Sequence, residues 1–443
     1  MTLSILCLGI LSTASAEEKL FPLPSQLQDN VDFWTRIYGL YSSRQVVIHD
    51  KENLAVVYEV LNLNEFTGDS TDLNTKWDFV EQEKEKFRLA LMRLHEMSKP
   101  IPLDSLNQVE FAVFIEWADV QDDGKYLRAF DNIRGQLGLC DRFRESVQRS
   151  GFYYPYIKEI FQSFQLPTEL CSMPHVESLF NYKSYSKAGA AGIWQFIPHT
   201  GMLFLTINNA LDERLDPVLA TVAAAKLLQK SYNELGSWPL AITAYNHGLN
   251  GMKSAMQQFG NDDFGLVYNQ YKSRSFGFAS KNFYSEFLAA LHVSQNHFLY
   301  FKDLAVAPPF NFQTIELLEP LKIAQAANIF SVPIDTLAAY NPAFRKSIVD
   351  NIVPIPAGYH FRLPYREGFD PREVLARHAS TVESPVKAQP AVTPDSLITL
   401  QHDSVLILSA PPIKMPEHPF RADDMLNSPP RQSNLNAAPL PEN

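Results

Sequence analysis

The stretch from Leu166 to Thr200 constrains the fold of this 443-residue chain more than any other part of it. Pro167 suits the first turn of a helix, and the apolar residues after it predict a helix that carries Glu177 close to its end. A polar run then breaks the helix, and Gly189 and Gly192 enclose two alanines. Small residues let a backbone approach a ligand closely. The stretch therefore predicts a single carboxylate facing a small-residue segment, an arrangement typical of a sugar cleft.

Fixed spacings connect Glu177 to residues further along the chain. Ser186 follows it by nine positions and Gln195 by 18, and Ala-Tyr-Asn-His-Gly stands at 244–248. With their neighbours these residues fill every fixed position of the pattern E-S-x-F, S-x-x-G-A-x-G-x-x-Q-x-x-P-x-T and A-Y-N-x-G. The set resembles the catalytic domain of the lytic transglycosylases, the soluble-transglycosylase superfamily, which implies a lysozyme-like fold. The segments 140–157 and 276–284 further resemble its membrane-bound lytic transglycosylase D-like branch.

We predict a mainly α-helical chain in several parts, because its length exceeds that of a typical single domain. Hydrophobic residues make up 46% of it, enough to bury a core. The predicted parts are a signal peptide at 1–16, a mostly helical N-terminal region at 17–150, the lysozyme-like catalytic domain at 151–300, a small α+β module at 310–365 and a disordered, Pro-rich tail at 366–443.

Hydrophobic periodicity places the elements of the first parts. In the N-terminal region we expect an amphipathic helix at 72–97 and short strands at 45–50 and 54–61. In the catalytic domain we expect a helix that begins near Trp238 and ends at 245–248. This helix places Tyr245 and Asn246 at its C-terminus, where side chains can face a groove.

The segment 310–364 changes character. A strand, two short helices and a closing strand follow one another, and this β-α-α-β order resembles a LysM peptidoglycan-binding module. A structural appendage of the same shape is the alternative. After it, the chain is rich in Pro, Ser, Asn and Gln and cannot bury enough apolar surface to offset the entropy of ordering.

Residues 1–16 have the pattern of a secretory signal peptide. Their apolar run is shorter than the roughly 20 residues that span a bilayer, and Ala14-Ser15-Ala16 supplies a small-residue cleavage site. A buried N-terminal strand is the alternative. We therefore expect an exported protein, periplasmic or associated with the cell envelope, with peripheral attachment to the wall or outer membrane as an option.

Charge and cysteine content limit the partners. The formal net charge is −11 and no basic stripe occurs, so nucleic acid is not expected as a partner. The histidines show no metal-ligand spacing, and neither a metal nor a cofactor is expected. In the exported chain Cys140 and Cys171 remain, either as a disulfide or as two free thiols.

Glu177 is the candidate acid for glycoside cleavage, which requires a proton for the leaving group. Its apolar neighbours Val176, Leu179 and Phe180 can desolvate the carboxyl and raise its pKa. The alternative is an ordinary Glu on a helix surface. Most glycosidases use a second carboxylate, but no acidic residue occurs between Glu177 and Asp212.

The resemblance implies a route with one carboxylate. Glu177 protonates the oxygen between N-acetylmuramic acid and N-acetylglucosamine, then accepts a proton from the muramyl 6-hydroxyl, which attacks the anomeric carbon. The product is a 1,6-anhydromuramyl end, and the partner is the peptidoglycan glycan strand.

The resemblance also assigns supporting roles. Ser186, Gln195 and Tyr245 hydrogen-bond the sugars or the N-acetyl group. Asn246 either contacts the ligand or buttresses the turn at Tyr245, and Tyr284 either lines the groove or is a buried aromatic. The acidic residue that some relatives carry shortly before the equivalent tyrosine is missing here, since Ala279 and Ser280 occupy the corresponding positions.

Two other functions fit the same residues. A hydrolase with the same fold, like goose-type lysozymes, would give a reducing end instead of an anhydro end. A catalytically silent protein would bind peptidoglycan without cleaving it, although such a protein has no need of Glu177 together with the rest of the motif.

Overall fold

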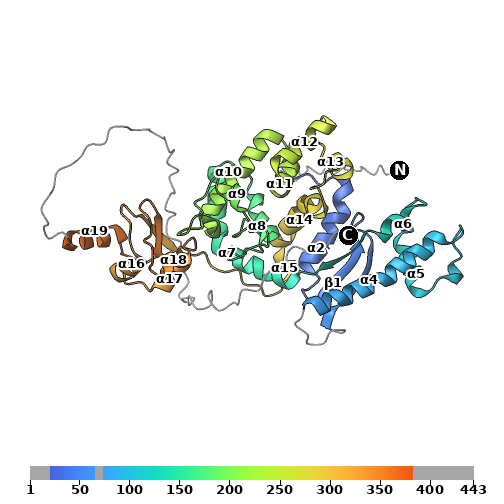
Figure 1. The fold of residues 1–443 in the computed structure, drawn as a ribbon, viewed down its shortest axis with the longest axis horizontal. Helices are drawn as coiled ribbons and strands as arrows, with labels where there is room; N and C mark the ends of the chain where they lie inside the picture. The colour runs from blue at the N-terminus through green and yellow to red at the C-terminus, as the bar shows by residue number, and fades with distance from the viewer. Residues whose placement is uncertain (1–19, 65–72, 383–443) are drawn as a thin grey trace, which may run out of the picture. The chain divides into compact units, whose positions relative to one another are not determined.

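The computed structural model of the protein describes residues 20–64 and 73–382, and these residues are mostly helical, as predicted (Figure 1). The predicted signal peptide and the part of the tail beyond 382 lie outside the described residues.

The chain divides into two compact units. The first combines the chain up to Asn181 with Thr221–Pro308, and the second combines Tyr182–Ala220 with the chain from Pro309 onward. The domain boundaries expected from the sequence stay predictions.

The N-terminal part of the first unit is built around a small sheet. Its elements are α2 (Gln28–Gly39), β1 (Gln45–Asp50), β2 (Val57–Asn62), α4 (Leu73–Glu96), α5 (Gln108–Glu116), α6 (Lys125–Phe130) and β3 (Ile133–Leu137). The strands are antiparallel in the order β2-β1-β3. The predicted strands and the predicted helix at 72–97 are confirmed, whereas the sequence analysis missed β3, a short strand interrupted by a glycine.

The rest of the first unit is helical. It comprises α7 (Cys140–Ser163), a short 3-10 turn (Thr168–Ser172), α8 (Met173–Glu177), the part of α10 (Pro217–Leu235) from Thr221 on, α11 (Trp238–His247), α12 (Leu249–Phe259), α13 (Phe264–Gln270), α14 (Phe278–Gln295) and α15 (His297–Tyr300). The predicted helix from Trp238 to the Tyr-Asn pair is therefore confirmed.

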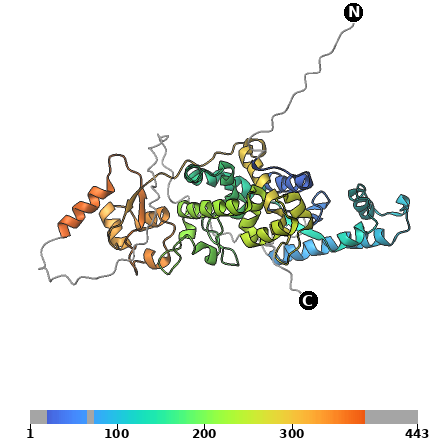
Figure 2. The same cartoon turned by 90° about the horizontal axis from the view of Figure 1, so that it is seen from above.

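β1 is buried on both faces because successive side chains of a strand point to opposite sides. Val46 and Ile48 belong to a core with α4, α5 and α6, which pack together (Figure 2). Val47 belongs to a second core with side chains of α2, α7 and α14. The N-terminal region is thus packed into the helical body rather than attached to it by a linker.

Helix α2 supports α14 directly. The buried Asn30 side-chain amide donates hydrogen bonds to Tyr268 Oη and to Asn282 Oδ1, both at 2.8 Å. The second core and these polar contacts fix α14.

The second unit joins two distant segments. Residues 182–220 contribute α9 (Pro198–Gly201), a 3-10 turn (Glu213–Leu215) and the first turn of α10. The C-terminal segment contributes β4 (Phe312–Glu316), α16 (Ile323–Phe330), α17 (Ile334–Tyr340), α18 (Lys346–Val349), β5 (His360–Pro364) and α19 (Pro371–Val382). β4 and β5 pair antiparallel, which confirms the β-α-α-β order and adds α18 to it.

The predicted disordered tail is wrong at its beginning, since α19 lies within it. Asp370 Oδ1 accepts a hydrogen bond from the Arg372 amide at 2.8 Å, and Val374 and Leu375 pack against the core of the C-terminal module. A cap and two apolar contacts therefore order a segment whose overall composition suggested none.

Candidate active site

Glu177 is the last residue of α8, as predicted, and the chain bends sharply after it. Leu179 and Phe180 both have left-handed backbone conformations, with φ of 53° and 55°. Such conformations cost roughly 1–3 kcal/mol each and persist only where the surroundings enforce them.

Two sets of hydrogen bonds enforce this bend. The amides of Ser178 and Phe180 both donate to the Pro174 carbonyl, at 3.1 and 3.0 Å. The Arg149 guanidinium of α7 donates to the Leu179 carbonyl from Nε at 3.2 Å and from Nη2 at 2.8 Å. The bend that follows Glu177 is thus held both by α8 itself and by α7.

The surroundings of Glu177 favour its protonated form. Burial is the main cause, and the charge of Glu286 adds to it, so that the pKa of the Glu177 carboxyl is raised to about 8. A carboxyl with this pKa retains its proton at neutral pH and can donate it to a leaving group.

Glu286 of α14 is a candidate functional residue that the sequence analysis missed. Burial raises the pKa of its carboxyl to about 8, although a hydrogen bond from Tyr38 and the charge of Arg134 act in the opposite direction. A signal was present: Glu286 lies three residues after Phe283 and four before Ala290, both buried, and so interrupts the apolar stripe of a helix.

Tyr38 of α2 connects the two carboxyls electrostatically. Its buried hydroxyl donates a hydrogen bond to Glu286 Oε2 at 3.4 Å, and its ring stacks on Phe143 with centroids 4.8 Å apart. Burial and then the charges of Glu286 and Glu177 raise the pKa of the phenol well above its ordinary value. Tyr38 therefore stays neutral and acts as a hydrogen-bond donor.

Tyr245 lies in the last turn of α11 and is half-buried. Burial raises the pKa of its phenol well above the ordinary value, and the charge of Glu177 raises it further. Tyr245 and Glu177 therefore share one electrostatic environment.

Asn246 is exposed, and its Oδ1 accepts a hydrogen bond from the Ser280 hydroxyl at 2.7 Å. Ser280 is the third residue of α14, and this contact ties α14 to the end of α11. This contact favours the buttressing role that the sequence left open for Asn246.

Two other polar side chains of the same unit, those of Tyr284 and His175, lie in its core. Tyr284 is fully buried, and its hydroxyl donates to the Pro22 carbonyl at 2.8 Å, which favours the buried-aromatic alternative over contact with a groove. His175 pairs with the Ser146 hydroxyl at 2.7 Å, and burial lowers the pKa of its imidazole to about 3.

Ser186 and Gln195 belong to the second unit, in a tight loop. Ser186 Oγ accepts a hydrogen bond from the Ala190 amide at 2.9 Å, and Gln195 Nε2 donates to the Gly192 carbonyl at 2.8 Å. Gly192 has φ of 77°, and a Cβ there would lie 1.7 Å from the Arg214 carbonyl oxygen. The small residue is needed for backbone packing in this loop.

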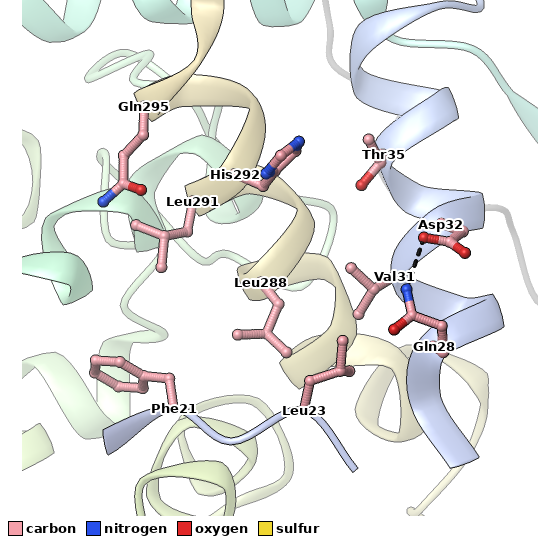
Figure 3. Close-up of a pocket in the computed structure, with 10 residues that line it drawn as sticks. All are labelled: Phe21, Leu23, Gln28, Val31, Asp32, Thr35, Leu288, Leu291, His292 and Gln295. Atoms are coloured by element: carbon pink, nitrogen blue, oxygen red, sulfur yellow. Dashed lines mark hydrogen bonds between the residues drawn. The ribbon is translucent and has the colours of Figure 1, made fainter. Parts of the chain in front are cut away.

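A groove of about 450 Å³ lies between α2 and α14 (Figure 3). Val31, Leu288 and Leu291 are among its apolar lining, and Gln28 donates a hydrogen bond to Asp32 at 2.9 Å on its α2 side. None of the predicted site residues lines it.

Within residues 20–64 and 73–382, no group of three or more His, Cys, Asp or Glu side chains could hold a metal ion. Cys140 and Cys171 are free thiols, and burial raises the pKa of the Cys171 thiol to about 12. Nor do the described ranges include a helix with the length and apolarity that crossing a membrane requires.

Two family models match the chain. The model of the transglycosylase SLT domain matches residues 156–266, and the model of the LysM-like domain of lytic transglycosylase MltD matches residues 311–370. These matches confirm both resemblances found in the sequence.

Individual proteins are also similar to the chain. Membrane-bound lytic murein transglycosylase D of Escherichia coli strain K12 is 26% identical over 307 residues, which cover 62% of this chain and 65% of that protein. A putative tributyltin chloride resistance protein of Alteromonas sp. strain M-1 is 32% identical over 126 residues, 28% of this chain and 60% of that one. The chain thus spans less than two thirds of these curated relatives.

Among solved structures, the 70 kDa soluble lytic transglycosylase of Escherichia coli matches 44% of this chain and 32% of its own, with 20% identity and a TM-score of 0.28. The matched families and their residue ranges lead to one assignment: the chain carries a transglycosylase SLT domain followed by an MltD-type LysM-like domain.

Proposed function

We propose that the protein is a peptidoglycan lytic transglycosylase. It cleaves the β-1,4 bond between N-acetylmuramic acid and N-acetylglucosamine without water and leaves a 1,6-anhydromuramyl end. The observation that carries the proposal is the carboxyl of Glu177, at a strained helix end, with a pKa raised to about 8 within a matched SLT domain.

In the first step Glu177 donates its proton to the glycosidic oxygen as the bond to the anomeric carbon breaks. Protonation of the leaving oxygen avoids the expulsion of an alkoxide, and positioned general acids contribute about 10²–10⁴-fold to such steps. The substrate's own N-acetyl group stabilises the positive charge at the anomeric carbon.

In the second step the Glu177 carboxylate accepts the proton of the muramyl 6-hydroxyl as its oxygen bonds to the anomeric carbon. The carboxylate accepts this proton readily because burial disfavours its charge and so favours reprotonation. One residue thus serves as acid and then as base, and is regenerated.

The presence of a second carboxyl, that of Glu286, near Glu177 favours the alternative function, a lysozyme-like hydrolase. A second carboxylate in the same environment could activate water as a general base. However, the pKa of Glu286 is itself raised to about 8, so this carboxyl is largely protonated at neutral pH and is a poor base there. We therefore place transglycosylation first.

Ser186, Gln195 and Tyr245 are the proposed substrate-binding residues, whereas Asn246 buttresses the end of α11 through Ser280. Tyr245 shares the electrostatic environment of Glu177, and its neutral hydroxyl can donate to the N-acetyl group. The LysM-like domain would bind peptidoglycan as well, and export to the periplasm with peripheral envelope attachment is the setting that fits such a substrate.

The test compares the release of soluble fragments from purified peptidoglycan by the parent protein and by Glu177→Gln. We expect the variant to lose at least about a hundredfold in rate. Glu169→Gln, eight positions earlier, is the matched control and should retain activity. Equal release by Glu177→Gln and the parent would remove Glu177 from the mechanism.

A further inference from the structure

The LysM-like domain is docked onto the segment that precedes α10. Leu211 of that segment is buried in the core of the LysM-like domain. The Asp212 amide donates to the Ala343 carbonyl at 2.8 Å, and the Arg345 amide donates to the Ala210 carbonyl at 2.9 Å. Shared core and backbone pairing make this contact part of the fold of the second unit.

Asp212 is the polar centre of this contact and is fully buried. Its carboxylate accepts hydrogen bonds from Arg214 Nε and Nη2, both at 2.9 Å, and from Arg345 Nη2 at 3.0 Å. The exposed Tyr185 also donates to it, at 3.1 Å. Burial disfavours the charge, but the two arginines outweigh burial and hold the pKa of Asp212 below its ordinary value.

Arg214 extends this centre to the loop that carries Gln195. Its Nη1 donates to the Gly189 carbonyl at 2.7 Å and to the Phe196 carbonyl at 3.0 Å. One guanidinium therefore bonds the loop on both sides of Gln195, while its other edge is held by Asp212. A continuous series of charged hydrogen bonds, through Arg345, Asp212 and Arg214, thus connects the LysM-like domain to the loop.

A second buried ion pair reinforces the docking. Arg362 of β5 bonds both carboxylate oxygens of Asp216. Asp216 also accepts from the amides of Val218 and Leu219, at 3.0 and 3.1 Å, and so caps the start of α10. In both ion pairs an arginine of the LysM-like domain binds an aspartate of the short segment 212–216.

We propose that the LysM-like domain positions the Gly-rich loop 184–196 through Arg345, Asp212 and Arg214, in addition to any wall binding. Arg345 is a positioning residue for the loop that carries Ser186 and Gln195. The proposal rests on the proposed function in so far as that loop binds substrate. Without Arg345, Asp212 keeps one arginine, and Arg214 is no longer held from the side of the LysM-like domain.

The test uses Arg345→Gln in the otherwise complete protein, with Lys346→Gln as its matched control. Lys346 is the next residue, loses the same charge, and pairs with the exposed Asp350 instead of Asp212. The substrate is a soluble peptidoglycan tetrasaccharide, for which attachment to the wall is irrelevant. The order of the loop is measured separately by amide hydrogen exchange in the peptide that covers 186–196.

We expect Arg345→Gln to lower kcat/KM on the soluble substrate by roughly threefold to thirtyfold. Exchange at the Ala190, Ala191 and Gly192 amides, all hydrogen-bonded within the loop, should speed up, with partial recovery in Arg345→Lys. Lys346→Gln should match the parent in both measurements.

Unchanged hydrogen exchange in Arg345→Gln would overturn the proposal, as would faster exchange without any loss of turnover. Inactivity of the parent protein would instead contradict the proposed function. In that case the exchange data would still decide whether the LysM-like domain holds the loop.

Discussion

The hydroxyl of Tyr38 donates a hydrogen bond to Glu286 at 3.4 Å, and this contact joins the N-terminal helix α2 to the helix α14 beside the candidate acid. The charge of Glu286 in turn acts on Glu177. The N-terminal region therefore contributes to the electrostatics of the site as well as to its packing.

The first prediction concerns Glu286→Gln. The substitution removes the nearby negative charge that favours the protonated form of Glu177, so the pKa of Glu177 should fall. The alkaline limb of the kcat/KM profile should therefore move to lower pH, because activity requires the protonated acid. Glu159→Gln, on the exposed face of α7, should leave the profile in place. An unmoved alkaline limb in Glu286→Gln would contradict the coupling.

The second prediction links Glu177 to stability. Its pKa is raised from 4.5 in the unfolded chain to about 8 in the folded protein, so the folded state holds a proton that the unfolded state releases between these values. Stability should fall as pH rises through this window. Glu177→Gln removes the effect and should unfold at a higher temperature than the parent near pH 8, by about 2–4 °C per kcal/mol.

The same measurement near pH 4.5 is the control. At that pH the carboxyl is neutral in the folded state and about half protonated in the unfolded state as well. The raised pKa of Glu177 then costs the parent little stability, so the two unfolding temperatures should converge. A difference that stays constant across this range would show that Glu177 is not the titrating group.

The third prediction concerns Arg149→Gln. The variant loses two hydrogen bonds to the Leu179 carbonyl, and the bend that fixes Glu177 loosens. Small displacements of a catalytic group can cost up to about a hundredfold in rate, so we expect kcat to fall by roughly tenfold to a hundredfold. Arg144→Gln, exposed on the same helix, should keep the parent kcat. If both variants behave alike, Arg149 does not position the acid.

The fourth prediction compares two glycines by chemical unfolding. Gly192 and Gly236 both have left-handed backbones, with φ of 77° and 67°. Gly236→Ala meets no atom within 4 Å and should cost only the backbone strain, about 1–2 kcal/mol. Gly192→Ala also overlaps the Arg214 carbonyl, which should add roughly 1–3 kcal/mol. Equal losses would contradict the tight packing of this loop.

Local patterns predicted the parts of the site that depend on short stretches of chain. The end of α8 at Glu177 follows from an apolar run and its breakers, and the position of Tyr245 follows from a helix that begins at Trp238. The β-α-α-β order of the C-terminal module was likewise readable from alternation and helical periodicity.

Contacts between distant residues could not be predicted in this way. Glu286 stands more than a hundred positions after Glu177, and only the packing of α14 against α2 and α8 brings its charge to bear on it. The buried Asp212 and the half-buried Arg345 form an ion pair across a similar separation. Glu286, Asp212 and Arg345 all lie outside the motif that the sequence analysis used. A charge contact fixes positions in space and leaves no fixed spacing along the chain.

The mass of the muropeptides released from purified peptidoglycan tests the central claim most directly. A transglycosylase should release fragments that end in 1,6-anhydromuramic acid, each lighter by one water than the corresponding reducing-end fragment, and Glu177→Gln should release neither. Reducing-end fragments as the main product of the parent protein would contradict the one-carboxylate route and would make Glu286 the candidate base for water.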